Sequence, residues 1–303
     1  MRKVAISVGD LNGIGIELIL KNHKTISKII QPIYCIDKQM LEQACSKLNI
    51  ILPIDLNIIA PTSEYFDIKA GEINRQSGKY SFDSFTTAIK LAQCGDVDAI
   101  CTLPIHKKAW ELAGIKYKGH TDALRDFCDS EAIMMLGCPS LFVALYTEHI
   151  PLCEVASNVT VEKLTRFLIS YANSVQSDKR IGVLGLNPHA GDGGVLGNEE
   201  SIIAEAITLA NRILDIYDTN ILVPDIAFTP HVRAKYTHMV AMYHDQGLAP
   251  LKALYFDESI NVSLNLPILR TSVDHGTAFD KAYQNAMLNN LSYINAIKYI
   301  AEN

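Results

Sequence analysis

The sequence of 303 residues lacks several features that mark whole classes of protein. It has no apolar run of the roughly 18 residues that a membrane span needs, and no polybasic run, so we expect neither a membrane nor a nucleic-acid partner. The chain has 27 Lys and Arg residues against 33 Asp and Glu residues, so we expect any basic surface to be a local pocket. The N-terminus reaches Gly9-Asp10 before an apolar stretch of signal-peptide length forms, so we expect a cytoplasmic protein.

Several short chemical motifs are also missing. The seven cysteines form no CxxC pair, which favours reduced, mostly buried thiols over disulfides. There is no HExxH motif, so no metal site is recognisable from local spacing. The junction from Gly9 to Gly15 is not GxGxxG and lacks a ribose-binding acid at the usual distance, which excludes an ordinary Rossmann fingerprint.

Strand-like and helix-like segments alternate along the chain, and this alternation predicts an α/β protein with a largely parallel sheet. The expected strands are Lys3–Val8, Ala99–Leu103, Ala132–Leu136, Leu141–Tyr146, Ile181–Leu186 and Met239–Tyr243. The expected helices are Ile14–His23, Ser81–Gln93, His106–Ala113, Val161–Val175 with Thr160 as its cap, the region 199–216, and Leu291–Ala301.

Polar residues gather directly after the buried strands, where ligands bind in parallel α/β sheets. His149, His189 and His244 each lie in a loop that follows such a strand. Any one of them alone is more often a surface histidine or a satisfied core histidine. Three in equivalent positions favour a catalytic metal site, since neutral imidazole is the commonest nitrogen ligand. Asp245 and Asp192 are candidates for holding an imidazole tautomer.

A second set of residues suits a phosphate monoester. Lys252, Asn261 and Arg270 supply two cations and an amide donor, although Lys252 alone is more typical of a solvated surface. His120 and Thr121 stand at an expected helix start, where they face a bound ligand or, for Thr121, cap the helix.

A loop near the C-terminus is a candidate nucleotide site. Asp274, His275 and Gly276 precede an expected helix, so a nucleotide would stack or hydrogen-bond there, or Asp274 would cap the helix. The run Gly191–Gly194 also leads towards a helix, and its backbone either approaches an anion closely or forms a flexible turn.

Four stretches of this sequence are distinctive: Gly119-His120-Thr121, Leu186-Asn187-Pro188-His189-Ala190-Gly191, Ala241-Met242-Tyr243-His244-Asp245-Gln246-Gly247, and Arg270-Thr271-Ser272-Val273-Asp274-His275-Gly276-Thr277-Ala278. Together they resemble the PdxA family of vitamin B6 synthesis. The resemblance implies the isocitrate/isopropylmalate dehydrogenase-like fold, with two α/β/α domains around a central cleft. We place the first domain at 1–125 with 265–303 and the second at 126–264.

The resemblance also implies an activity. The family oxidises 4-phosphooxy-L-threonine with NAD or NADP and a divalent metal (zinc, magnesium or cobalt), and the 3-keto acid decarboxylates to 3-amino-2-oxopropyl phosphate. It works as a homodimer with the active site at the subunit interface. By motif, the metal ligands match His149, His189 and His244, and the substrate contacts match His120, Thr121, Lys252, Asn261 and Arg270. The general base is open between Asp245 and Lys107, and Asp274, His275 and Gly276 are the cofactor candidates.

Two other functions fit the same motifs. One is a sister dehydrogenase of another phosphorylated hydroxy acid, such as a four-carbon sugar acid phosphate. The other is a non-catalytic metal- and phosphate-binding sensor, which the intact histidine and cation sets argue against. The family's Gly-Asp-Pro-Ala-Gly-Ile-Gly opening carries Leu11 and Asn12 here, and Leu103 replaces a small residue before Pro104.

Overall fold

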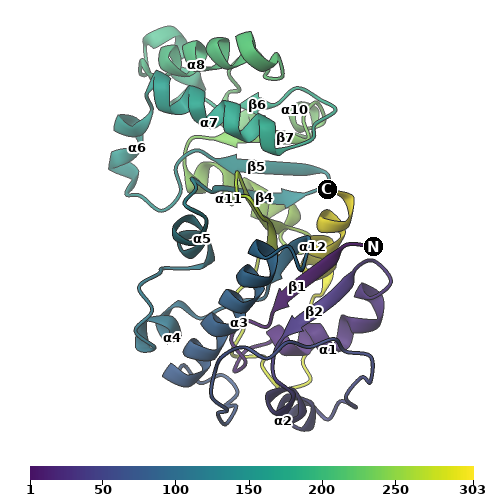
Figure 1. Cartoon of the computed structure of the whole chain (residues 1–303). Helices are drawn as coiled ribbons and strands as arrows, with labels where there is room; N and C mark the ends of the chain where they lie inside the picture. The colour runs from purple at the N-terminus through teal and green to yellow at the C-terminus, as the bar shows by residue number, and fades with distance from the viewer. The chain divides into compact units, whose positions relative to one another are not determined.

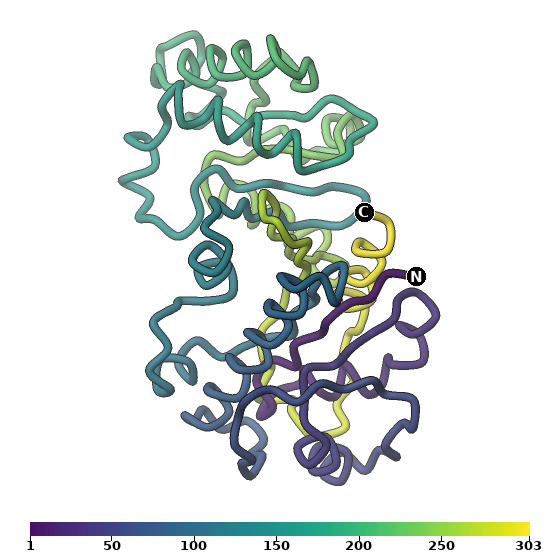
Figure 2. The backbone as a smooth tube through the Cα atoms, viewed as in Figure 1, coloured from purple at the N-terminus to yellow at the C-terminus, as the bar shows by residue number.

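The strand predicted at the N-terminus forms at Lys3–Ser7 (β1) and belongs to the first of two units. The computed structural model describes residues 1–303. The first unit comprises Met1–Ser130, Ile260–Val262 and Leu266–Asn303, and the second comprises Glu131–Ser259 and Ser263–Asn265. The end of the chain therefore returns to the unit in which it began, as the yellow and purple segments of Figure 2 show.

The first unit contains a parallel sheet of β1, β2 (Gln31–Cys35), β3 (Ala99–Thr102) and β9 (Leu269–Val273), in the order β2-β1-β3-β9. Strand β8 (Ile260–Leu264) belongs partly to each unit. The helices are α1 (Gly15–Ile26), α2 (Lys38–Leu48), α3 (Arg75–Gln93), α4 (Lys107–Leu112), α5 (His120–Cys128) and α12 (Leu291–Glu302). Helix α3 packs against β1 and β2 (Figure 1) and against β3, and α12 packs against β9 and β3. The inner strands of the sheet are buried on both faces, as expected where helices cover a parallel sheet.

Helix α3 is longer than the predicted Ser81–Gln93, because it begins at Arg75. Asn74 caps this end, and its side chain accepts a hydrogen bond from the Ser77 N–H at 2.9 Å. Gly78 weakens the helical pattern of the first turns, yet the packing requires it. A Cβ at Gly78 would overlap the carbonyl oxygen of Ala109, so glycine allows α4 to approach α3 closely.

The second unit contains β4 (Ile133–Cys138), β5 (Leu141–Leu145), β6 (Gly182–Val183) and β7 (His238–Ala241). They combine an antiparallel hairpin with parallel strands, in the order β4-β5-β7-β6. The helical segments are α6 (Leu152–Asn158), α7 (Val161–Ser174), η1 (Pro188–Gly194), α8 (Glu199–Leu214), α9 (Pro224–Ala227), α10 (Pro230–Arg233) and α11 (His244–Tyr255). The predicted cap of α7 is confirmed, since the Thr160 hydroxyl accepts a hydrogen bond from the Lys163 N–H.

Local structure departs from the sequence prediction at several places. His244 was expected in a loop after a strand, but it is the first residue of α11, whose first turn carries Asp245, an acid well placed at a helix N-terminus. The edge strand β2 was missed because Pro32 interrupts its pattern, and a proline is tolerated at a sheet edge. None of the helices has both the length and the apolar character to cross a membrane.

Candidate active site

A buried guanidinium reaches the carboxyl end of β3 in the first unit. Arg270, on β9, is 2% exposed. Its Nε and Nη2 donate to the Thr102 hydroxyl at 3.2 and 2.7 Å, and its Nη1 donates to the Asn261 Oδ1 at 3.3 Å. Burial lowers the pKa of Arg270 to about 10, so the side chain remains a cation at neutral pH. A desolvated, directional cation of this kind suits an anion such as phosphate.

The contact with Arg270 also orients the Asn261 amide. Its oxygen accepts from the guanidinium, so its NH₂ group points to the other side of the amide and remains a donor. Arg270 and Asn261 therefore offer a positive charge and a neutral N–H donor from neighbouring positions. This is the combination that the sequence predicted for a phosphate monoester.

His120 is the first residue of α5, and its side chain packs against two aromatic rings. Its ring meets those of Phe85 and Trp110 edge-on, with centroids 4.7 and 5.6 Å apart. Burial, and secondarily the charge of Arg270, hold the pKa of His120 well below its ordinary value, so the imidazole is neutral. Its buried Nε2 has no hydrogen-bond partner in the chain. A neutral imidazole with an unpartnered nitrogen is suited to a hydrogen bond with a ligand.

Two other predicted residues lie near His120 along the chain or in space. Thr121 is buried in the first turn of α5. Lys107 begins α4 and is exposed, and its Cε lies beside Gly119, which precedes His120.

The loop predicted to bind a cofactor does not lead directly into a helix. After Asp274, His275 and Gly276 the chain remains irregular until α12 begins at Leu291. The Asp274 N–H donates to the Ser292 hydroxyl, and a side chain built on Gly276 would meet nothing within 4 Å. The loop is therefore tied to α12 through Asp274, and there is open space beside its glycine.

The positions that depart from the PdxA pattern are buried in the first unit. Leu11, Asn12 and Leu103 are all fully buried. The Asn12 side chain accepts from the Lys69 N–H at 2.9 Å and donates to the Glu72 carbonyl at 2.8 Å. These departures act on packing and on the tethering of residues 69–72.

Two of the three predicted metal ligands lie together in the second unit. The ring centroids of His149 and His244 are 5.6 Å apart. The His244 Nδ1 lies 2.6 Å from the Asp245 Oδ1, which favours the tautomer that leaves Nε2 available to a metal. Asp245 thus takes the tautomer-holding position that the sequence predicted for it.

His189 does not join that pair, and no group of three or more His, Cys, Asp or Glu side chains in the chain is arranged to hold a metal. Two imidazoles with a carboxylate behind one of them suit two positions of a histidine-bound metal. The donor chemistry therefore fits, but the set within one chain is incomplete. Lys252, on α11, is half-buried with its Nζ 5.8 Å from the centre of the Phe256 ring.

His189 is exposed on η1, in an unusual backbone. Residues 189–193 all have positive φ, and three of them are not glycine. The left-handed conformation costs about 1–2 kcal/mol for each such residue. Glu200, which sequence patterns did not single out, anchors the start of this loop: its Oε1 accepts the N–H groups of Leu186 and Asn187 at 2.9 and 2.7 Å. Its place in the first turn of α8, after the Asn-Pro-His motif, was the only available signal.

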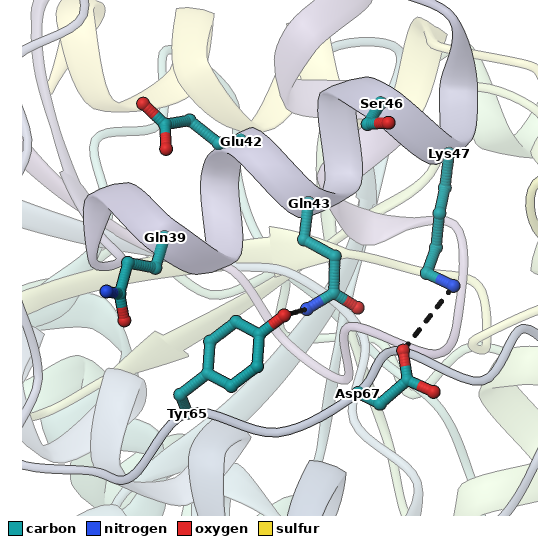
Figure 3. Close-up of a pocket in the computed structure, with 7 residues that line it drawn as sticks. All are labelled: Gln39, Glu42, Gln43, Ser46, Lys47, Tyr65 and Asp67. Atoms are coloured by element: carbon teal, nitrogen blue, oxygen red, sulfur yellow. Dashed lines mark hydrogen bonds and ion pairs between the residues drawn. The ribbon is translucent and has the colours of Figure 1, made fainter.

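A hollow of the first unit lies elsewhere, over α2 (Figure 3). It has a volume of about 660 Å³, and none of the predicted site residues lines it. Its lysine, Lys47, is paired with Asp67 at 3.6 Å, and the Gln43 amide donates to the Tyr65 hydroxyl at 2.6 Å. The cation of this hollow is therefore already paired with a carboxylate of the same hollow.

Comparison with known proteins identifies the family. Residues 28–300 match the family described as pyridoxal phosphate biosynthetic protein PdxA. The chain belongs to the PdxA family. A PdxA relative from Sulfurimonas denitrificans, named 4-hydroxythreonine-4-phosphate dehydrogenase, is 58% identical, and the match covers 98% of this chain and 96% of the relative.

Solved structures agree with the PdxA assignment. The crystal structure of a 4-hydroxythreonine-4-phosphate dehydrogenase from Klebsiella pneumoniae matches with a TM-score of 0.84 at 30% identity, covering 99% of this chain and 100% of the other. A β-decarboxylating dehydrogenase from Thermococcus kodakarensis, 13% identical, matches with a TM-score of 0.53 over 99% of this chain and 82% of its own, which shows a shared fold. The predicted family and fold class are confirmed.

Proposed function

We propose that the chain oxidises the 3-hydroxyl of 4-phosphooxy-L-threonine with NAD or NADP in pyridoxal phosphate synthesis. A hydride passes from C3 to the nicotinamide, and the hydroxyl proton leaves. The resulting 3-keto acid loses CO₂ from C1, and the electron pair is accepted through the C3 carbonyl before protonation gives 3-amino-2-oxopropyl phosphate. The observation that carries this proposal is the buried Arg270, bonded to Asn261 beside a neutral His120.

Substrate recognition is assigned to Arg270, Asn261, His120 and Thr121, and Lys252 is added because it matches the family motif. Arg270 makes a charge-assisted contact with the phosphate, the Asn261 NH₂ adds a donor, and Lys252 adds a second charge. His120 hydrogen-bonds to the substrate through its unpartnered Nε2 without adding charge, and Thr121 lies beside it. Fixing the phosphate in this way holds C3 still for hydride transfer.

The metal would be held by His149 and His244 with a third imidazole. A divalent cation bound there supplies a Lewis acid that lowers the pKa of the substrate hydroxyl and stabilises negative charge on that oxygen. Since His189 does not meet the other two within the chain, we propose that His189 comes from a second copy. This is the basis on which we propose a homodimer whose active sites need both chains.

Contacts within the chain also support an assignment of the general base and of the cofactor contact. Asp245 is hydrogen-bonded to His244, which favours Lys107 as the group that accepts the hydroxyl proton. Lys107 is exposed and lies beside the residue that precedes His120. The loop of Asp274, His275 and Gly276 is the proposed nicotinamide-cofactor contact, because its glycine leaves open space for a ligand.

The decisive assay follows NADH or NADPH formation from three classes of substrate. We expect turnover with 4-phosphooxy-L-threonine and little with 4-hydroxythreonine, which lacks the phosphate. Turnover only with another phosphorylated hydroxy acid would indicate a sister dehydrogenase. Binding of the metal and the phosphate without turnover of any substrate would contradict a catalytic role.

A further inference from the structure

Thr102 is the residue that fixes the direction of the Arg270 guanidinium. It is the last residue of β3 and is fully buried. Ile100 and Arg270 are partners in the parallel pairing of β3 with β9, so Thr102 lies two residues further along the same face as Ile100. From this place its hydroxyl oxygen accepts hydrogen bonds from both Nε and Nη2 of Arg270.

The chemistry of the two side chains makes this contact directional. A guanidinium can hold an oxyanion bidentately through its Nε–Nη edge or through its Nη1–Nη2 edge. Thr102 holds the first edge, and the second edge carries the contact with Asn261, the other residue assigned to the phosphate. Threonine is β-branched and stiff at χ1, so its oxygen is a fixed acceptor on a buried strand.

We propose that Thr102 is a positioning residue for the phosphate site: its hydroxyl holds Arg270 so that the Nη1–Nη2 edge is presented to the anion before the anion arrives. The proposal rests on the phosphate role proposed for Arg270. Without the hydroxyl, Nε becomes a buried donor without this acceptor, and the long side chain must turn to find another. The cation then has to be reordered at the moment of binding, which weakens binding of the anion.

The test compares two substitutions at Thr102 with a matched control. Thr102→Val keeps the shape and removes the acceptor, whereas Thr102→Ser keeps the oxygen. Thr271→Val is the matched control. Thr271 lies on β9 and, like Thr102, is a fully buried threonine, but its hydroxyl donates to the Ala296 carbonyl at 3.1 Å. Affinities for 4-phosphooxy-L-threonine and for inorganic phosphate are measured by calorimetry on the full-length protein, alongside thermal unfolding.

We expect Thr102→Val to weaken binding of both phosphate ligands roughly tenfold, since hydrogen bonds to charged groups are among the stronger ones. Thr102→Ser should restore affinity to within about threefold of the original protein. Thr271→Val should leave both affinities unchanged, even if it unfolds at a lower temperature.

Two results overturn the proposal, and they differ from failure of the function itself. If Arg270→Ala loses affinity and Thr102→Val does not, Thr102 only fills space. If Thr102→Val and Thr271→Val weaken binding equally, the loss reflects general loosening of the sheet. If Arg270→Ala binds both ligands as tightly as the original protein, the phosphate role of Arg270 fails, and the role of Thr102 fails with it.

Discussion

The two units differ in how far their proposed ligand-binding side chains are buried and ordered before a ligand binds. The first unit holds phosphate residues, and the second holds the metal residues. Arg270 is 2% exposed and hydrogen-bonded to Thr102 and Asn261, whereas the side chains of His149 and His244 are 61% and 37% exposed. An anion gains most from a cation that is desolvated and oriented before it binds. A metal ion instead gathers its own ligands on binding, so its histidines need not be ordered in advance.

Removing one metal ligand should have the largest effect on activity. His244→Ala and His189→Ala should each abolish turnover and lower the content of bound divalent metal, because each removes one of three ligands. Mixing the two inactive proteins should restore roughly a quarter of the activity through hybrid dimers, in which one site regains all three histidines.

The control for this experiment is a mixture of His149→Ala with His244→Ala. These two rings lie together in one chain, so no hybrid site regains both, and the mixture should stay inactive. Activity restored in that mixture, or a protein that sediments as a monomer and still turns over, would contradict the shared site.

Removing the phosphate cation should have the next largest effect. Arg270→Ala should lower kcat/KM for 4-phosphooxy-L-threonine by a factor that corresponds to about 2–5 kcal/mol, the range for a buried charge pair. The weak turnover of 4-hydroxythreonine should change little, because that substrate has no phosphate to lose. Equal losses for both substrates would mean that Arg270 serves the protein in another way.

A buried acid in the first unit and a buried histidine in the second should make opposite contributions to the pH dependence of stability. Burial raises the pKa of Asp10 to about 6, so the folded first unit holds this proton more tightly than the unfolded chain does. The resulting stability is present below pH 3.8 and is lost as the pH rises through 6. Burial lowers the pKa of His238 to about 4, so its contribution to the second unit is present above pH 6.5 and is lost as the pH falls through 4.

Each contribution amounts to roughly 3 kcal/mol at its limit. Free energies of opening from amide hydrogen exchange, measured at pH 7.5 and pH 4.5, isolate each contribution as the difference between the original protein and a variant, because the buried His120 of the first unit opposes Asp10. Asp10→Asn should remove a gain of stability at pH 4.5 from the first unit, and His238→Phe should remove a loss of stability at pH 4.5 from the second. A pH dependence that neither substitution changes would refute the assignment.

Sequence patterns predicted single elements better than the partnerships between them. The Thr160 cap and the helix start at His120 depend on neighbours along the chain, and both were confirmed. The bond between Thr102 and Arg270 joins residues 168 positions apart, and it depends on a strand register that no local pattern contains. His149, His189 and His244 were grouped because each follows a predicted strand. Their positions in the sequence did not show that only His149 and His244 lie side by side.

The smallest expected effect concerns Glu200, which anchors the loop of His189. Its carboxylate accepts from two backbone N–H groups and from the Asn187 side chain. Glu200→Gln keeps an oxygen for the backbone but turns an NH₂ group towards the Asn187 NH₂, so one hydrogen bond to a charged group is lost, worth about 1–2 kcal/mol. Metal affinity should fall by roughly tenfold while the affinity for inorganic phosphate stays the same, because none of the residues assigned to the phosphate belongs to this loop.

Glu205→Gln, on the same helix but without a role in the loop, is the control and should change neither affinity. If Glu200→Gln weakens phosphate binding as much as metal binding, the two ligands are not prepared independently, and the contrast between the units disappears.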